Sequence, residues 1–149
     1  MVPKKKRKPL SIVCKSAARI AAVQIIYNIL ASTKPIEQVS NEYFVSFKKD
    51  LENQFDIVSL DVDYLELILT NFDHGYEKII EVYLTQDWKL DRMSNVDKAI
   101  LFTGITELKL NSNLSKNIII SEYIEIAQQM SGESSFINKV LDKFSESNI

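Results

Sequence analysis

The chain has 149 residues, of which 46% are hydrophobic and 26% are charged, the balance of an ordinary folded domain. Its single cysteine, Cys14, and single histidine, His74, exclude an internal disulfide and a structural zinc site with four Cys and His ligands. The three glycines, Gly75, Gly104 and Gly132, lie far apart, which excludes a Gly-rich phosphate-binding loop. Disulfide scaffolds, zinc fingers and nucleotide-dependent enzymes of that kind are therefore excluded.

The net charge of -2 conceals an uneven distribution of charge along the chain. Residues 1–19 hold seven Lys and Arg and no acidic residue, whereas the rest holds eleven basic and twenty acidic residues. Lys and Arg bind polyanions because they release counterions from phosphates. The basic end therefore predicts contact with nucleic acid, and a solvated tail that only keeps the protein soluble is the alternative. We expect residues 1–13 to form a disordered basic tail and residues 14–149 to form a single all-α RNA-binding domain.

No apolar stretch of the sequence approaches the roughly 18–20 residues of a membrane-spanning helix. The stretch after the basic end is interrupted by Lys15 and Arg19 and lacks the pattern of a cleaved signal peptide. We therefore expect a cytoplasmic protein that does not bind membranes.

Apolar residues recur at steps of three and four along the whole chain, and no stretch alternates in the manner of a strand. This pattern predicts an all-α fold of about six to seven helices. The first helix ends before Ser32 and has the inward positions Ala18, Ala21, Ala22, Ile25, Ile29 and Leu30. Pro35 suits the first turn of a second helix, whose apolar positions continue to a polar break near Asn53.

The second half of the chain carries clearer start and stop signals. An apolar stripe that begins at Val62 predicts one bent helix, or two helices with a joint at His74 and Gly75. Ser94, with an acid three residues later at Asp97, is a hydroxyl cap that predicts the start of the next helix.

Two further helices complete the predicted fold. The polar run Asn111 to Asn117 precedes a helix that ends at Met130. After Gly132, Ser134 or Ser135 is expected to cap the last helix.

The sequence offers little for catalysis but an ordered set of cations for binding. Because His74 is the single imidazole and no nucleophile signature lies near it, we expect no enzyme activity, no catalytic residues, no metal and no cofactor. Lys15 and Arg19 are four residues apart and therefore project from one face of the first helix. The predicted RNA-binding residues are Lys4, Lys5, Lys6, Arg7, Lys8, Lys15 and Arg19.

Five strings of the sequence form a recognisable series: ARIAAVQIIY (Ala18 to Tyr27), WKLDRMSNVDKAIL (Trp88 to Leu101), Glu107-Leu108, ISEYIEIAQ (Ile120 to Gln128) and FINKVLDK (Phe136 to Lys143). In order and at nearly the same spacing, they resemble the motifs of the NusB transcription antitermination family. The resemblance covers most of the chain and is strongest after Trp88.

The resemblance implies an all-α fold of two small packed helical bundles and a protein that is not an enzyme. It implies binding of boxA RNA from ribosomal RNA leaders together with ribosomal protein NusE, within a bacterial RNA polymerase antitermination complex. Arg19 matches the family's RNA-binding arginine, and Lys15 stands in its basic run. Tyr27 and Asp97 match residues that face the ribosomal protein.

The sequence departs from the family pattern where Phe102 replaces the usual arginine, Ser121 an asparagine and Lys139 a glycine. Met130 also replaces a common aromatic residue, and the loop Ser131 to Ser135 is shorter than in the family. Similar helical domains precede the catalytic domain of ribosomal RNA cytosine methyltransferases, so a helical RNA-binding or adaptor module is the alternative function. A monomer and a homodimer both fit the apolar helix faces, since a face buried in either looks the same in the sequence.

Overall fold

The computed structural model describes residues 10–32, 34–35, 37–42, 60–73, 75–84, 93–110, 113–130 and 133–147. Within these ranges the regular structure is helical and no strand occurs, which confirms the all-α fold. The helices are α1 (Leu10–Ala31), α3 (Val62–Asn71), α4 (Tyr76–Val82), α5 (Asn95–Lys109), α6 (Lys116–Met130) and α7 (Ser134–Ser147), and residues 37–42 are also helical.

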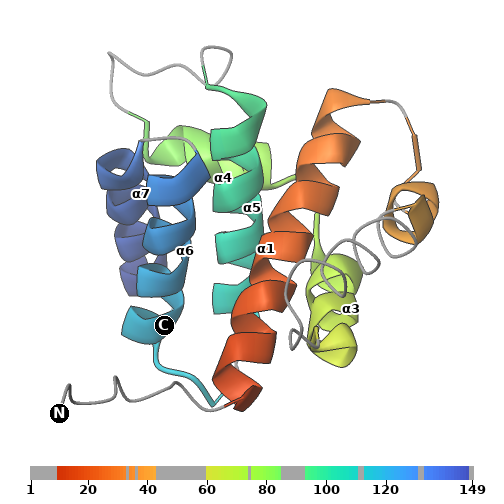
Figure 1. The fold of residues 1–149 in the computed structure, drawn as a ribbon. Coiled ribbons are helices and arrows are strands. Elements are labelled where there is room, and N and C mark those ends of the chain that lie inside the picture. The colour runs from red at the N-terminus through yellow and green to blue at the C-terminus, as the bar shows by residue number, and fades with distance from the viewer. Residues whose placement is uncertain are drawn as a thin grey trace, which may run out of the picture.

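The helix α5 lies at the centre of the fold (Figure 1). It packs against α1 on one side and against α6 and α7 on the other, while α3 packs on α1 and α4 crosses near α5. Every residue from 99 to 107 of α5 is buried, because neighbouring helices cover it on all sides.

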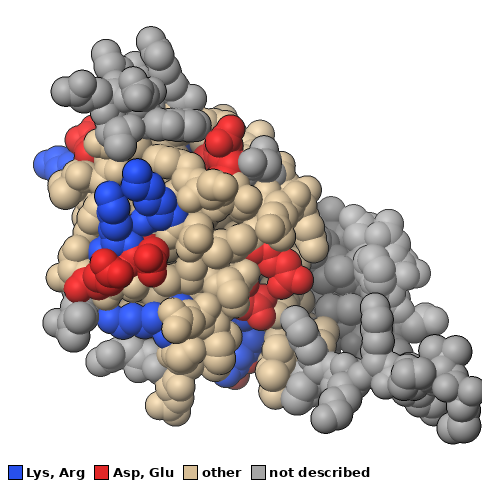
Figure 2. Space-filling model, turned by 90° about the vertical axis from the view of Figure 1, so that its left-hand side faces the viewer, with Lys and Arg blue, Asp and Glu red and all other residues tan. Residues whose placement is uncertain are grey.

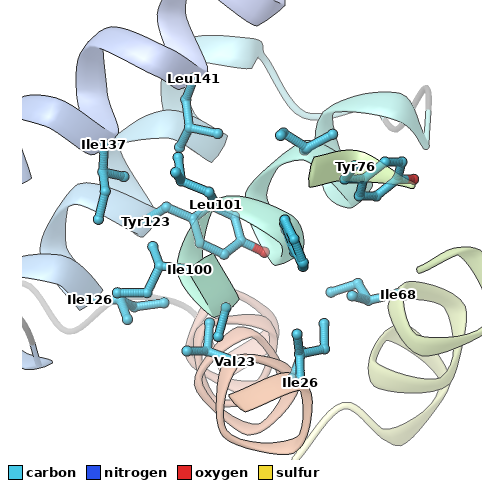
Figure 3. Close-up of a cluster of buried hydrophobic side chains, with 14 of the residues drawn as sticks. Val23, Ile26, Ile68, Tyr76, Ile100, Leu101, Tyr123, Ile126, Ile137 and Leu141 are labelled. Carbon is cyan, nitrogen blue, oxygen red and sulfur yellow. The ribbon is translucent and has the colours of Figure 1, made fainter. Parts of the chain in front are cut away.

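The buried side chains of all six helices meet in one core (Figure 3). They include Val23 and Ile26 of α1, Ile68 of α3, Tyr76 of α4, Ile100 and Leu101 of α5, Tyr123 and Ile126 of α6, and Ile137 and Leu141 of α7. Gly104 permits the close approach of α5 to α7, since a Cβ atom there would lie 3.0 Å from Leu141 Cδ2.

The first helix is longer than expected at its N-terminal end. It begins at Leu10, so residues 10–13, which we assigned to the basic tail, belong to α1 instead. Its segment Ser11–Ala31 is long and apolar enough to cross a membrane by length and composition, contrary to the expectation that no stretch qualifies. Half of that segment is buried in the fold, as expected of the core helix of a globular protein.

The predicted joint and cap in the middle of the chain are confirmed. The apolar stripe that begins at Val62 is divided between α3 and α4. Asp61 caps α3 by accepting the Tyr64 N–H at 3.0 Å, and Ser94 Oγ caps α5 by accepting the Asp97 N–H at 3.1 Å. His74 lies outside the described residues.

Three other predicted helix boundaries differ from the structure or lie outside it. Lys116 and Asn117 belong to α6, because Ser115 Oγ accepts the Ile118 N–H and ends the polar run earlier. Ser134 is already helical, so α7 begins after Glu133 and neither predicted serine precedes it. Residues 43–59, which would hold most of the predicted second helix, lie outside the described residues.

Candidate nucleic-acid interface

The first half of α1 carries the two described cations of the predicted RNA surface. Lys15 and Arg19 lie one helical turn apart and both approach the ring of Tyr64 on α3. Lys15 Nζ lies 5.3 Å from the ring centroid and Arg19 Cζ lies 5.7 Å from it. The spacing therefore places both side chains on one face, as predicted, but their exposure differs.

Arg19 is a core residue, which makes its assignment to the RNA surface wrong. Only 2% of its surface is exposed. Its Nε and Nη2 atoms donate to Glu107 Oε1 at 2.7 Å and to Glu107 Oε2 at 2.8 Å. This bidentate pair joins α1 to α5 inside the fold, where the guanidinium group has no access to a phosphate.

Glu107 is the centre of a buried polar cluster contributed by four helices. Its Oε1 also accepts the Tyr123 hydroxyl at 2.7 Å, and its Oε2 accepts the Tyr64 hydroxyl. Both carboxylate oxygens are thus satisfied twice, which compensates for the complete burial of this acid. The cluster of Arg19, Tyr64, Glu107 and Tyr123, here called the Glu107 cluster, holds α1, α3, α5 and α6 in register.

The protonation of the Glu107 cluster follows from its burial and its charges. Burial works to lower the pKa of Arg19, but the hydrogen bonds and charge of Glu107 outweigh it and raise the pKa. Burial raises the pKa of the Tyr64 and Tyr123 hydroxyls, and the adjacent carboxylate raises it further. Both tyrosines therefore stay neutral and donate to Glu107.

Of the predicted RNA-binding residues that the structure describes, Lys15 is the one that is not buried. It is half-buried, and its ammonium group lies over Tyr64. This contact holds the Lys15 side chain against the same tyrosine that donates to Glu107. The predicted RNA-binding residues Lys4, Lys5, Lys6, Arg7 and Lys8 lie outside the described residues.

The face of the molecule formed by α6 and α7 is not uniformly basic. Figure 2 shows it as a surface on which basic and acidic side chains are interspersed. On α7, Lys139 and Lys143 are exposed together with Asp142 and Glu146. Such alternation favours solubility over attraction of a polyanion.

The two residues expected to face a protein partner differ in exposure. Tyr27, near the end of α1, is 38% exposed, which is unusually high for a large aromatic side chain in this fold. Asp97, in the first turn of α5, is only 5% exposed. The expectation that it faces a protein partner therefore disagrees with the structure, which buries its carboxylate. Its Oδ1 accepts no hydrogen bond from the described residues.

The departure from the family pattern at Phe102 has a structural explanation. Phe102 is fully buried, with its ring centroid 5.9 Å from that of Phe72 and 6.3 Å from that of Tyr76. The side chain at this position therefore packs in an aromatic part of the core. Three further departures, at Ser121, Met130 and Lys139, are exposed.

Sequence reasoning missed Glu107 as the partner of Arg19. Glu107 was visible only as part of the Glu107-Leu108 string, although it is an acid within a nearly continuous buried segment of α5. A charged residue in such a segment needs a buried counter-charge, and Arg19 is an arginine among the alanines and isoleucines of α1. A charged residue within an apolar stretch of each helix, Arg19 in α1 and Glu107 in α5, was the signal in the sequence that could have predicted this pair.

The described residues contain no group of three or more His, Cys, Asp and Glu side chains that could hold a metal ion. Fold and site thus define a class: a small helical protein whose described ionic cluster is structural and whose sequence concentrates basic residues before and at the start of its first helix.

Comparison with known proteins places the chain within this class. A model of the NusB family matches residues 16–146. The chain is 32% identical over 120 residues to a transcription antitermination protein NusB of Clostridium botulinum (strain Kyoto / Type A2), covering 78% of this chain and 83% of the relative. It is 31% identical over 137 residues to the Caulobacter vibrioides protein of the same name, covering 86% and 89%. The chain belongs to the NusB family.

This membership confirms the resemblance of the five sequence strings. The named relatives are bacterial transcription antitermination proteins. The function of the chain accordingly lies in transcription antitermination, and the chain is a regulatory protein, not an enzyme.

Proposed function

We propose that this protein binds a boxA-type sequence in the leader of ribosomal RNA together with ribosomal protein NusE. The bound complex helps RNA polymerase to read through terminators in the bacterial cytoplasm. The observation that carries the proposal is the gathering of cations before and at the start of α1, on a chain whose remaining residues are strongly acidic. Such a basic end attracts an RNA backbone, whereas the acidic body repels it.

The RNA contact consists of Lys15 and the basic segment Lys4 to Lys8. Lys15 is positioned by its contact with Tyr64, and the segment ends at Lys8, two positions before Leu10, where α1 begins. A contact with three to five phosphates of a single strand gives log affinity against log salt a slope of about -2 to -3.5. Arg19 supports this surface only indirectly, by fixing α1 on α5.

Tyr27 is the residue we propose for the contact with NusE. An exposed tyrosine offers a large apolar ring and a hydroxyl at low cost in side-chain entropy, which is why tyrosine is enriched in interfaces. RNA binds this protein together with NusE, and NusE binds this protein together with RNA. Bound RNA therefore raises the occupancy of NusE, and bound NusE raises the occupancy of RNA. Neither contact needs to be tight alone.

Fluorescence anisotropy tests the proposal. A labelled boxA-type RNA and a scrambled RNA of the same composition are titrated at two salt concentrations, with and without NusE. We expect a preference for boxA that NusE strengthens, with the salt slope given above. Equal binding of both RNAs that NusE does not change would overturn the proposal and favour an adaptor with a different ligand.

A further inference from the structure

A groove of about 240 Å³ separates the first half of α1 from α6. Its apolar walls come from Val13 and Ile20 of α1 and from Ile126 of α6. Glu122 and Glu125 of α6 also line it. The groove therefore combines an apolar surface with two carboxylates one turn apart, a combination suited to a cationic segment with aliphatic side-chain stems.

The negative charge of this α1–α6 groove is not neutralised by the Glu107 cluster behind it. Arg19 Nη1 lies 3.6 Å from Glu122, but the same guanidinium group is bonded at 2.7 and 2.8 Å to Glu107. One cation thus serves two carboxylates. Ser16 Oγ donates to Glu122 at 3.1 Å and adds no charge. Among the described residues Glu125 is exposed and has no ion-pair partner.

The chain itself supplies a segment with the complementary charge. Lys4 to Lys8 are five consecutive cations, and they precede Leu10, where α1 begins. Val13, the first groove residue, follows only three positions later. If the six residues from Lys4 to Pro9 are extended, they span about 20 Å. The groove side of α1 is shorter, because the helix rises by only about 15 Å from Leu10 to Ile20. The segment is long enough to turn back and lie along the groove.

We propose that the basic segment Lys4 to Lys8 docks in the α1–α6 groove of its own chain, with its cations at Glu122 and Glu125. The short connection to α1 gives the segment an effective concentration in the groove on the order of millimolar, so a weak contact suffices. If the proposed function holds, RNA and the groove compete for the same cations. The groove then opposes binding of RNA that offers few phosphates.

Paramagnetic relaxation in the full chain tests the docking without RNA. A nitroxide is attached at position 2 in a Val2→Cys, Cys14→Ala protein, which leaves a single thiol. We expect strong broadening of the amide signals of residues 122–129, lost at 1 M salt because the Debye length falls from about 10 Å at 0.1 M to about 3 Å. Unbroadened signals in 122–129 at low salt would overturn the proposal.

Charge substitutions identify the groove as the docking site. The variant Glu122→Gln with Glu125→Gln should lose the broadening, and Glu125→Gln alone should reduce it without touching the contact of Glu122 with Arg19. The matched control, Glu77→Gln with Glu81→Gln, removes the same charge from two exposed positions on α4 and should keep it. Equal broadening in all variants would contradict the proposal.

Two further measurements distinguish docking within one chain from docking between two chains, and from failure of the proposed function. Broadening of isotope-labelled protein by nitroxide on a second, unlabelled copy would show docking between chains and overturn docking within one chain. Addition of boxA-type RNA should relieve the broadening. If the RNA does not bind at all, the proposed function fails while the docking result stands, so the two failures are distinguishable.

Discussion

Arg19 and Glu107 are 88 positions apart in the sequence and form two hydrogen bonds of 2.7 and 2.8 Å in the core. Tyr64 and Tyr123 donate to the same carboxylate from two other helices. The charge of α1 that most resembles an RNA contact in the sequence is therefore part of the framework that positions α1. Lys15, one turn earlier, stays near the surface on the same framework.

Removal of the carboxylate of the Glu107 cluster should destabilise the fold severely. Glu107→Ala leaves the guanidinium of Arg19 buried without a counter-charge, which costs about 3–5 kcal/mol in the free energy of unfolding. Urea denaturation measures this loss. The matched control Glu125→Ala, on the exposed side of α6, should change stability by no more than about 0.5 kcal/mol. Similar losses in both variants would show that the cluster does not hold the helices together.

The same cluster predicts a loss of stability at alkaline pH. The pKa values of Tyr64 and Tyr123 are raised in the folded state, so above pH about 10 the unfolded chain loses protons that the folded chain retains. Fewer protons in the unfolded state mean that the free energy of unfolding is fully present below pH about 10 and falls as the pH rises further. Each such tyrosine contributes a slope of up to about 1.4 kcal/mol per pH unit.

Denaturation midpoints at a series of pH values check this prediction. Tyr123→Phe should flatten the alkaline decline, since the titrating hydroxyl is gone. Tyr27→Phe, which removes an exposed hydroxyl on α1, should leave it as steep as in the wild type. An identical decline in both variants would assign it to other groups.

Loss of Lys15 should weaken RNA binding while leaving the fold intact. Lys15→Gln removes one phosphate contact, which reduces the magnitude of the salt slope by about 0.7. Its contact with the Tyr64 ring contributes only about 0.5–1 kcal/mol to stability. Anisotropy titrations measure the slope, and Lys143→Gln, an exposed lysine on α7, is the control. A slope changed as much by Lys143→Gln as by Lys15→Gln would argue against a defined RNA surface.

The cap of α5 provides a local test of the central helix. Ser94 Oγ accepts the Asp97 N–H at 3.1 Å, so Ser94→Ala should lower the free energy of unfolding by about 1 kcal/mol. Ser94→Asp restores an acceptor and should recover most of the loss in a thermal or urea melt. Equal losses for alanine and aspartate would mean that the side-chain cap contributes nothing.

Local signals in the sequence predicted the parts of the fold that local chemistry decides. The serine before α5 and the division between α3 and α4 depend on caps and breaks within a few residues, and both were predicted. The start of α7 was not, because the first helical bond runs from the Ile137 N–H to the Glu133 carbonyl and needs no serine.

The fate of Arg19 depends on residues far along the chain and was not predictable from its spacing. A four-residue step places Lys15 and Arg19 on one helix face but does not say what covers that face. Glu107, 88 residues later, covers Arg19, and α3 brings Tyr64 over both. Asp97 follows the same logic, since its burial is set by the packing around α5.

A read-through assay measures the proposed antitermination activity itself. RNA polymerase transcribes a template with a boxA-type sequence before a terminator, in the presence of NusE, with and without this protein. We expect the protein to increase read-through and scrambled boxA to remove the increase. Neutralising Lys15 and the segment Lys4 to Lys8 should reduce the increase, whereas Lys143→Gln should not. Read-through that the protein leaves unchanged, or raises equally on the scrambled template, would contradict the proposed function.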